Sequence, residues 1–565
     1  MLSIRKIGVI SRTYRHLNRY RQILAILFKY GFGDLLEMLK IDQYIEVGLQ
    51  VISRKRAERS EKLTRPQRLR MAFAELGPTY IKLAQILSTR PDLVPVEYID
   101  ELALLQDKVP PLPFEEIKKV VEDEFGMPPE DLFESLDETP LASASIGQVY
   151  RAAIKDGEVL AVKIQRPGIR KIIEVDLEIM LHLATLAERH IEELSFHRPI
   201  KIVEEFARIL EKELDYKNEA TNMERIARQF LNVSHVYIPK VYRDFSTSRV
   251  LSTEFIEGIK ISEIDKLEAA GLDRKLITTR GADLVLKQVF DHGFFHADPH
   301  PGNIFVLPNN VICLLDFGMA GIVDHQTREE FVDLVDSVVN HNEVRAAQVL
   351  LELTQWEVEP ERRILEREVA DFMGRHLYKP LKDIQIAKLL RELLELATRF
   401  RLRLPADIFL MMKALSIVEG VGQMLDPDFD MIAQATPFIQ RVKLERFRPQ
   451  RIAGDLMELT SRMFQFFQRF PKDLLDIAEL IRRQKLRVQI EHKGLEHMLA
   501  THDQISNRIS FSILIAALII GSALIVISET PPLIFGISLI GIILFFAAAI
   551  MGIWLLVAIL RKGRL

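Results

Sequence analysis

His296-Ala297-Asp298-Pro299-His300-Pro301-Gly302-Asn303 is followed, after a short intervening segment, by Asp316-Phe317-Gly318. Two apolar runs, at 304–306 and 311–315, fill most of that interval, and Pro308-Asn309-Asn310 separates them. Apolar runs bounded by turn residues predict two buried strands joined in a hairpin. Asp298 and Asn303 therefore lie just before the predicted hairpin, and Asp316 lies just after it.

The spacing of these three residues is typical of a phosphoryl-transfer site. In such sites an Asp lies near the attacking oxygen, an Asn five positions later holds a metal ion, and an Asp after the next strand bridges metal to phosphate. We therefore predict Asp298 as catalytic and Asn303 and Asp316 as Mg²⁺ ligands. Asp and Asn beside Pro and Gly are also common turn residues. Taken alone, the three residues therefore fit an ordinary turn as well as they fit a phosphoryl-transfer site.

A second motif lies upstream, where residues 142–149 follow the nucleotide-loop pattern GxGxxGxV with alanine at the first two glycine positions. The predicted strand 159–163 ends in Lys163, whose compact ammonium suits the α- and β-phosphates of a nucleotide. The alanine methyl groups restrict the backbone, so we expect altered nucleotide preference rather than loss of binding. The predicted nucleotide-binding residues are Ala142, Ser143, Ala144, Ser145, Ile146, Gly147, Val149 and Lys163.

With these motifs in this order, the chain resembles the UbiB family of atypical protein-kinase-like proteins over about residues 65–330. Leu76-Gly77-Pro78-Thr79-Tyr80-Ile81-Lys82-Leu83-Ala84-Gln85 is similar to the family's KxGQ extension, with Ala84 where glycine is usual. Glu213-Leu214-Asp215-Tyr216-Lys217-Asn218-Glu219-Ala220 is similar to its ExD segment.

The resemblance implies an α+β, protein-kinase-like two-lobed fold with an N-terminal helical extension and a helical C-lobe. It places Lys82 against Glu213 and Asp215 in the catalytic set, and it pairs Glu219 with Lys163. On one continuous helix, Asp215 and Glu219 share a face and Glu213 lies about 240° from Glu219, so a single helix serves both contacts. A solvated, charged helix is the alternative. The resemblance also adds Glu254 and Ile256 to the nucleotide-binding residues.

The segment after Asp316 argues against an ordinary peptide kinase. No Ala-Pro-Glu follows to close an activation segment, and residues 324–327 instead predict a cap that begins an amphipathic helix. The resemblance implies an ATPase or a kinase of small molecules or lipids that binds ATP (or ADP) with Mg²⁺ and supports biosynthesis of ubiquinone or a related polyprenyl quinone. The alternatives are a non-catalytic nucleotide-binding scaffold for lipid enzymes, and a phosphotransferase of the choline or aminoglycoside kinase type.

The 565-residue chain has a net charge of −4, which gives no overall attraction to nucleic acid. Its single cysteine, Cys313, cannot form an internal disulfide and favours a reducing compartment. Residues 1–33 contain seven Lys and Arg and no acid, interleaved with apolar residues. This pattern predicts a helix on an anionic membrane surface, with a mitochondrial presequence as the alternative.

The C-terminal end predicts a transmembrane hairpin. Residues 509–528 and 533–560 are two uncharged runs, each long enough to span a bilayer, and Pro531-Pro532 breaks the helix between them. Basic residues before the first run and after the second place both ends in the cytoplasm, which predicts a two-helix protein of the bacterial inner membrane. A buried soluble hairpin is the alternative.

The predicted domains are a basic amphipathic region at 1–60, the helical extension at 61–135, an N-lobe at 136–260, a C-lobe at 261–430, helices near the membrane at 431–505 and the hairpin at 509–560. Amphipathic stretches at 365–377, 384–400 and 406–423 predict long C-lobe helices. Basic residues within 441–451 predict either a membrane contact or a solvated helix end. The expected partners are membrane lipids and polyprenyl-quinone precursors, with quinone-biosynthesis enzymes and a homodimer as further candidates.

Overall fold

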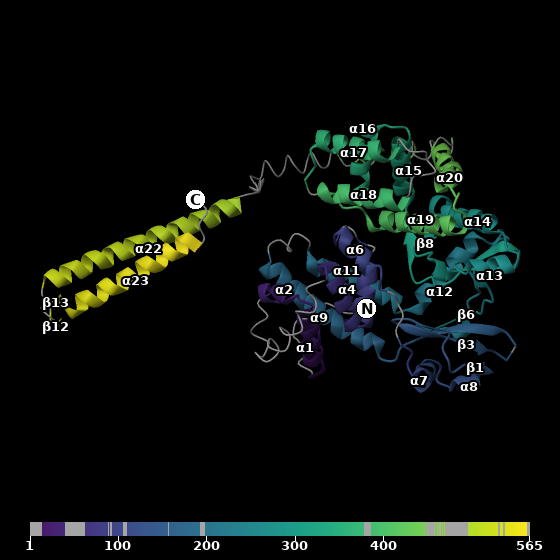
Figure 1. The fold of residues 1–565 in the computed structure, drawn as a ribbon, viewed down its shortest axis with the longest axis horizontal. Coiled ribbons are helices and arrows are strands. Elements are labelled where there is room, and N and C mark those ends of the chain that lie inside the picture. Colours follow the sequence, from purple (N-terminus) through teal and green to yellow (C-terminus); the bar gives the residue numbers. More distant parts are fainter. Residues whose placement is uncertain are drawn as a thin grey trace. The chain divides into compact units, whose positions relative to one another are not determined.

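The structure, a computed structural model, describes residues 14–39, 63–88, 90, 93–105, 110–155, 157–191, 198–356, 358–377, 386–446, scattered residues between 449 and 470, and 495–528, 531–534 and 537–561. The chain forms two compact units, Met1–Gly454 and Asp455–Leu565. Figure 1 shows the elements of both. Residues 1–13 and 40–60 of the predicted basic region, and residues 471–494 of the predicted helices near the membrane, lie outside the described residues.

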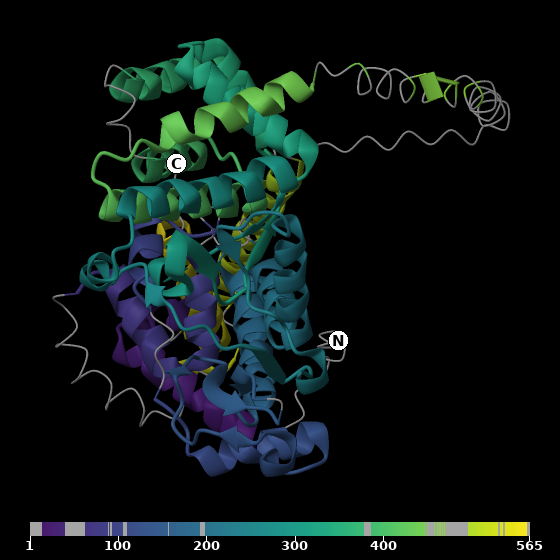
Figure 2. The ribbon, with the colours of Figure 1, turned by 90° about the vertical axis from the view of Figure 1, so that its right-hand side faces the viewer.

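The N-terminal extension is a set of helices that pack on α9 (Ile169–His190) and α11 (Pro199–Glu213), as Figures 1 and 2 show. These helices are α1 (Tyr14–Lys29), α2 (Gly33–Met38), α4 (Arg65–Leu76), α5 (Pro78–Leu87) and α6 (Val96–Leu102). The next two helices, α7 (Phe114–Phe125) and α8 (Pro129–Leu132), pack on the N-lobe sheet instead. Helix α4 begins with a capping box between Thr64 and Gln67. Gly77 then turns the chain at a φ of 96°, and Pro78 starts α5, the helix that carries Lys82.

Helix α1 packs inside the protein, which makes the predicted membrane-surface position wrong for residues 14–29. Ile23 and Leu24 of its apolar face are 0 and 4 % exposed in clusters shared with the extension and α9. On the polar face, Arg19 donates from Nε to Oδ1 of the buried Asp176 at 2.7 Å and from Nη2 to the Leu76 carbonyl at 2.7 Å. A basic amphipathic helix can bury its apolar stripe in protein as well as in lipid.

The N-lobe contains a five-stranded antiparallel sheet of order β1-β3-β4-β6, with β2 paired to β3. Its strands are β1 (Ser135–Leu136), β2 (Ala142–Ser143), β3 (Gly147–Ala153), β4 (Val159–Gln165) and β6 (Val250–Glu254). Along β4, Leu160, Val162 and Ile164 point into a core beneath α7, and all three are fully buried. Because side chains alternate along a strand, Lys163 points to the opposite face.

Helix α12 (Tyr216–Gln229) follows α11, and the chain then enters the C-lobe sheets. One sheet has the order β5-β10-β9-β7, from β5 (Val236–Tyr237), β7 (Ile259–Lys260), β9 (Ile304–Leu307) and β10 (Val311–Leu314); the other pairs β8 (Phe294–His296) with β11 (Ala320–Ile322). The predicted hairpin is confirmed, since β9 and β10 pair antiparallel around residues 308–310. The predicted cap is also confirmed: Asp324 accepts from the Thr327 N–H at the start of α15 (His325–Val339).

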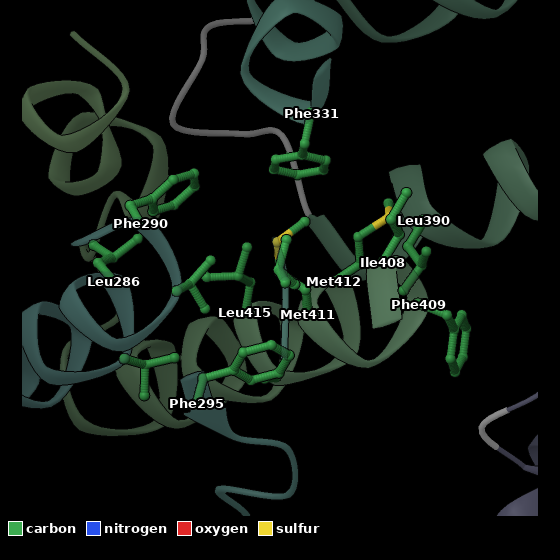
Figure 3. Packing of buried hydrophobic residues seen from close by; sticks show 14 of the residues in the cluster. Leu286, Phe290, Phe295, Phe331, Leu390, Ile408, Phe409, Met411, Met412 and Leu415 are labelled. Atoms are coloured by element: carbon green, nitrogen blue, oxygen red, sulfur yellow. The ribbon is translucent and has the colours of Figure 1, made fainter. Parts of the chain in front are cut away.

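The rest of the C-lobe is helical. It contains α13 (Ile264–Ala269), α14 (Arg274–Leu286), a π-helical turn at Lys287–His292, α16 (Glu343–Leu353), α17 (Arg362–Leu377), α18 (Ile386–Arg399), α19 (Ala406–Leu425) and α20 (Met431–Glu445). The three predicted amphipathic helices thus correspond to α17, α18 and α19. Figure 3 shows how Phe290, Phe331 and Met412 converge in the core that α18 and α19 share with α14, α15 and α20. Helix α17 packs in a neighbouring cluster with α16 and α18.

The described part of the basic stretch at 441–451 pairs with C-lobe acids. Arg441 donates to Asp291 at 2.8 Å, Lys443 pairs with Asp336, and Arg446 donates to Asp333 at 2.7 Å. These contacts satisfy the three cations within the protein. They hold α20 against α15 and the π-helical turn.

The second unit is a helical hairpin of α22 (Leu495–Ile527) and α23 (Leu539–Arg561). The first predicted span falls within α22, and residues 508–527 meet the length and composition of a membrane span. The start of the second span at 533 is wrong. Leu533–Ile534 and Ile537–Ser538 instead form two short paired strands, since the chain must turn after Pro531-Pro532 before α23 begins.

Candidate functional site

Lys163 of β4 lies between two acids from different lobes. Its Nζ is 2.9 Å from Oε2 of Glu219 on α12 and 3.5 Å from Oδ1 of Asp316, just after β10. The expected Lys163–Glu219 ion pair is therefore present. Glu219 is almost fully buried, whereas about half of the Asp316 side chain is exposed, so Asp316 remains accessible from solvent.

The prediction that one helix carries both ExD contacts is wrong. Helix α11 ends at Glu213, and α12 begins at Tyr216. Asp215 adopts an extended conformation (φ −115°, ψ 98°) and caps α12 by accepting the Lys217 N–H at 3.1 Å. The break lets Glu213 face the extension while Glu219 faces β4.

Lys82 reaches Glu213 as expected, with Nζ 2.5 Å from Oε1 and both side chains less than a fifth exposed. Asp215 lines a 530 Å³ charged cavity beside α11, with Arg170, Arg208 and Lys212 among the other lining residues.

Ala84, where the family has glycine, is fully buried in the cluster that contains Ile146 of the alanine-rich loop. Its methyl group is therefore part of the core that the extension shares with α9 and α11.

His296 braces the loop at residues 296–303, the predicted catalytic loop. Its Nδ1 accepts the backbone N–H of Asp298 at 3.1 Å, and its Nε2 lies 3.2 Å from the Leu315 carbonyl, to which it can donate. One accepting and one donating nitrogen describe a neutral imidazole, and burial lowers the pKa of His296 in agreement. Asn303 Nδ2 donates to the Asp298 carbonyl at 3.4 Å, so the three motif residues are held together.

Electrostatics keep Asp316 and Lys163 charged. The ammonium of Lys163 is the main cause that lowers the pKa of Asp316, and Lys82 adds to it against the opposing effect of burial. Burial works against the charge of Lys163, but Asp316 and Glu219 outweigh it and raise the pKa of Lys163. A carboxylate and an ammonium therefore persist side by side at neutral pH.

Arg166 holds the alanine-rich loop through hydrogen bonds of its guanidinium group. Its guanidinium donates to the Ala144 carbonyl at 3.0 Å, to the Ser143 hydroxyl at 2.8 Å and to the Pro110 carbonyl at 2.9 Å. Ala142 is exposed, Ser143, Ala144 and Val149 are half-buried, and Ser145, Ile146 and Gly147 are buried.

Gly147 is required by packing at the start of β3. A Cβ there would lie 2.3 Å from Tyr216 Oη and 2.8 Å from the Ile164 carbonyl oxygen. The buried hydroxyls of Tyr216 and Ser145 have no hydrogen-bond partner among the described residues. Buried polar atoms in this state mark a place where a ligand or water completes the site.

Glu254 and Ile256 lie where the chain passes from the N-lobe sheet to the C-lobe sheet. Glu254 ends β6 and accepts two contacts from the Tyr237 hydroxyl, at 2.6 and 2.8 Å, so its carboxylate braces the connection. Ile256 is half-buried in the connecting segment before β7.

The residues present fit a magnesium nucleotide. Mg²⁺ is usually held by one or two protein carboxylates together with substrate phosphates. Asp316 and Asn303 would supply the protein oxygens, and Lys163 would face the phosphates. Within the described residues, His, Cys, Asp and Glu do not gather in groups of three or more that could hold a metal ion by themselves.

Sequence reasoning missed three residues of this site. Arg166 lies three positions after Lys163 but carries no motif signal, and Tyr216 stands inside the ExD segment without a predicted role. The third is Lys413 of α19, whose Nζ lies 3.4 Å from Asp298 Oδ1. Its position in an otherwise apolar stretch of α19 is the only local sign.

Comparison with known proteins shows the family of the chain. Residues 104–350 match the ABC1 atypical kinase-like domain, residues 369–430 the UbiB helical domain, and residues 493–561 the ABC1/UbiB kinase-like C-terminal domain. A Clostridium pasteurianum protein named "Uncharacterized protein in hydrogenase 1 5'region" is 32% identical over 547 residues, which cover 97% of this chain and 99% of that protein.

An Aliivibrio fischeri protein named "Probable protein kinase UbiB" is 35% identical over 79% of this chain and 83% of its own length. The solved structure of the Rv3197–erythromycin complex from Mycobacterium tuberculosis is 26% identical, with a TM-score of 0.45 over 58% of this chain and 83% of that one. By its domain matches and its full-length relatives, the chain belongs to the UbiB family of ABC1 atypical kinase-like proteins.

Proposed function

We propose that the protein is a membrane-anchored atypical kinase or ATPase that binds Mg-ATP and supports biosynthesis of ubiquinone or a related polyprenyl quinone. The observation that carries the proposal is the position of Lys163, whose ammonium contacts Glu219 at 2.9 Å and Asp316 at 3.5 Å. A lysine held by a buried glutamate beside an accessible aspartate is suited to binding phosphates next to a metal ion. A purely structural ion pair does not need the second, accessible acid.

Each residue has a distinct role in this proposal. Lys163 holds the α- and β-phosphates, Glu219 orients Lys163, and Asp316 and Asn303 hold Mg²⁺. Asp298 accepts the proton of the attacking oxygen, and the His296 contact fixes the backbone that carries it. Mg-ATP supplies the transferable phosphoryl group, and the metal neutralises charge that develops on the phosphate oxygens.

Membrane anchoring is part of the proposal. Only 6% of residues 508–527, whose mean hydropathy is 2.7, are buried within the structure, whereas α19, with a mean hydropathy of 1.5, is 61% buried in the C-lobe core. An exposed apolar helix of this length is suited to a bilayer, and a buried one is a core helix. The pairing of α22 with α23 supports a hairpin with both ends on the same side of the membrane, and the basic residues that flank the two spans assign that side to the cytoplasm. Close helix contact at Gly541, where a Cβ would lie 2.5 Å from Val526, is typical of membrane helix pairs.

The test is Mg²⁺-dependent phosphate release from ATP by the full-length protein in lipid vesicles, with and without a polyprenyl phenol. Asp316→Asn should lower turnover by about 10²-fold or more, because an amide neither balances Lys163 nor binds Mg²⁺ as strongly. Asp336→Asn is the matched control, because Asp336 lies on α15, pairs with Lys443 of α20 and has no role in the proposed nucleotide site. Equal turnover in the wild type and Asp316→Asn would contradict the enzymatic part of the proposal.

The quinone part has its own test. A strain that lacks the gene should lose polyprenyl quinone, and wild type but not Asp316→Asn should restore it. Restoration by both proteins would favour a nucleotide-binding scaffold. Phosphorylation of a soluble small molecule without any effect on quinone content would favour a small-molecule phosphotransferase.

A further inference from the structure

The catalytic segment contains acids but no permanent cation. From Gln288 to Thr327, a stretch that includes Asp298, Asn303 and Asp316, the sequence has no lysine and no arginine. The histidines of the loop are engaged with the backbone: both ring nitrogens of His296 have partners, and His300 Nδ1 accepts the Gly302 N–H at 2.9 Å. Any cation that meets the transferred phosphate beside Asp298 must therefore come from another element.

Lys413 of α19 occupies that position. Its Nζ lies 3.4 Å from Asp298 Oδ1, and both side chains are about one third exposed, so a ligand can reach the pair. Within Ala406–Leu425 it is the sole basic residue. The site thus has Lys163 beside Asp316 at one point and Lys413 beside Asp298 at another.

The backbone on either side of Lys413 is fixed by the core. Met411 and Ala414 are fully buried, and Met412 is 7 % exposed. Figure 3 shows Met411, Met412 and Leu415 in the same apolar cluster as Phe295, the residue before His296. One core therefore sets the positions of both α19 and the strand that leads into the catalytic loop.

We infer that Lys413 binds the γ-phosphate of the nucleotide beside Asp298, an inference that rests on the proposed nucleotide site. In the transfer, the bond from the γ-phosphorus to the β–γ bridging oxygen breaks, a bond to the acceptor oxygen forms, and the acceptor proton passes to Asp298. Lys413 neutralises the peripheral oxygens of the moving phosphoryl group. Without nucleotide, Lys413 and Asp298 pair with each other.

The test compares the affinity for ADP with the affinity for an ATP analogue, which differ by the γ-phosphate. Lys413→Met keeps the length of the side chain and removes the charge, and Lys413→Arg restores the charge. Lys443→Met is the matched control, because Lys443 is similarly exposed and pairs with Asp336 on neighbouring helices. For each full-length protein in vesicles, the affinities for Mg-ADP and for a non-hydrolysable Mg-ATP analogue are measured by calorimetry, and kcat and KM for ATP by phosphate release.

We expect Lys413→Met to leave ADP affinity unchanged, to weaken analogue binding about tenfold, and to lower kcat by about 10²-fold. Lys413→Arg should recover most of both losses, and Lys443→Met should change neither. Equal effects on ADP and on the analogue, or no effect on either, would overturn the inference.

The test also distinguishes the two claims. If the wild type turns over no ATP but Lys413→Met still weakens binding of the ATP analogue alone, the enzymatic proposal is refuted and the role of Lys413 in binding the γ-phosphate is supported. Absence of nucleotide binding by the wild type would refute both.

Discussion

The ammonium of Lys82 lies 2.5 Å from the carboxylate of Glu213, and this contact joins α5 of the extension to the end of α11. Lys82 also helps to lower the pKa of Asp316. The extension is therefore electrostatically part of the site. A second pair, Lys29 and Glu75, has the same 2.5 Å separation but is more than one third exposed on both sides. The two pairs have the same separation and differ in burial, and each has a further neighbour, Asp316 for Lys82 and the Tyr30 hydroxyl for Glu75.

A double-mutant cycle should show this difference. With Lys82→Met and Glu213→Gln we expect a coupling free energy of about 1–3 kcal/mol, because removing one partner leaves a charge in a mostly buried place. With Lys29→Met and Glu75→Gln we expect about 0.2–1 kcal/mol. Both cycles are measured by urea unfolding of the full-length protein. Equal couplings would mean that burial does not strengthen the Lys82–Glu213 contact.

Gly147→Ala should destabilise the N-lobe. The new methyl group would overlap Tyr216 Oη and the Ile164 carbonyl oxygen, and overpacking of this kind costs about 1–3 kcal/mol. Gly281→Ala in α14 is the control, since its Cβ would meet no atom within 4 Å and should stabilise by about 0.5–1 kcal/mol. Thermal unfolding measures both changes. Adding Tyr216→Phe should recover part of the Gly147→Ala loss; no recovery would point to the Ile164 carbonyl as the main obstacle.

The contribution of Asp316 to the free energy of unfolding should depend on pH. Its folded pKa lies below the unfolded value of 3.8 because of Lys163, so its contribution is complete above that value and is lost as pH falls through the folded pKa. The difference in unfolding free energy between wild type and Asp316→Asn should therefore be constant from pH 5 to pH 7 and shrink below about pH 4. Denaturant unfolding over this range measures the difference. A difference that grows on acidification would contradict the assignment.

Cys313 should resist thiol reagents in the folded protein. It is fully buried in β10, and burial raises its pKa to about 12, so little thiolate forms at pH 8. Because the chain has one cysteine, a single colorimetric thiol assay reports on this site alone. We expect one equivalent to react in denaturant and almost none without it. Rapid labelling of the native protein would show that β10 opens readily.

The parts of the fold that depend on local sequence could be predicted. Residues 304–315 contain two apolar runs and a Pro-Asn-Asn turn, and they form the expected hairpin of β9 and β10. The strand ending near Lys163 and the cap at Asp324 follow the same kind of local rule. These elements place Asp298, Asn303 and Asp316, so the acidic half of the site could be read from the sequence.

Features that depend on distant packing could not be predicted. The segment from Glu213 to Glu219 is compatible with one helix, and the break at Leu214 and Asp215 arises where α12 is capped and packs against β6, with Glu219 reaching Lys163 of β4. The apolar stripe of α1 does not reveal whether protein or lipid covers it. Lys413 is 413 − 298 = 115 residues from Asp298 in sequence, and only the packed α19 brings them together.

The absence of lysine and arginine between Gln288 and Thr327 links chemistry to assembly. The counter-charges arrive on α5, β4 and α19, three elements that are far apart in the chain. Asp298 and Asp316 therefore gain their lysine neighbours only when α19 and β4 dock on the hairpin, so the charge balance of the site is a product of the assembled fold and not of the local sequence.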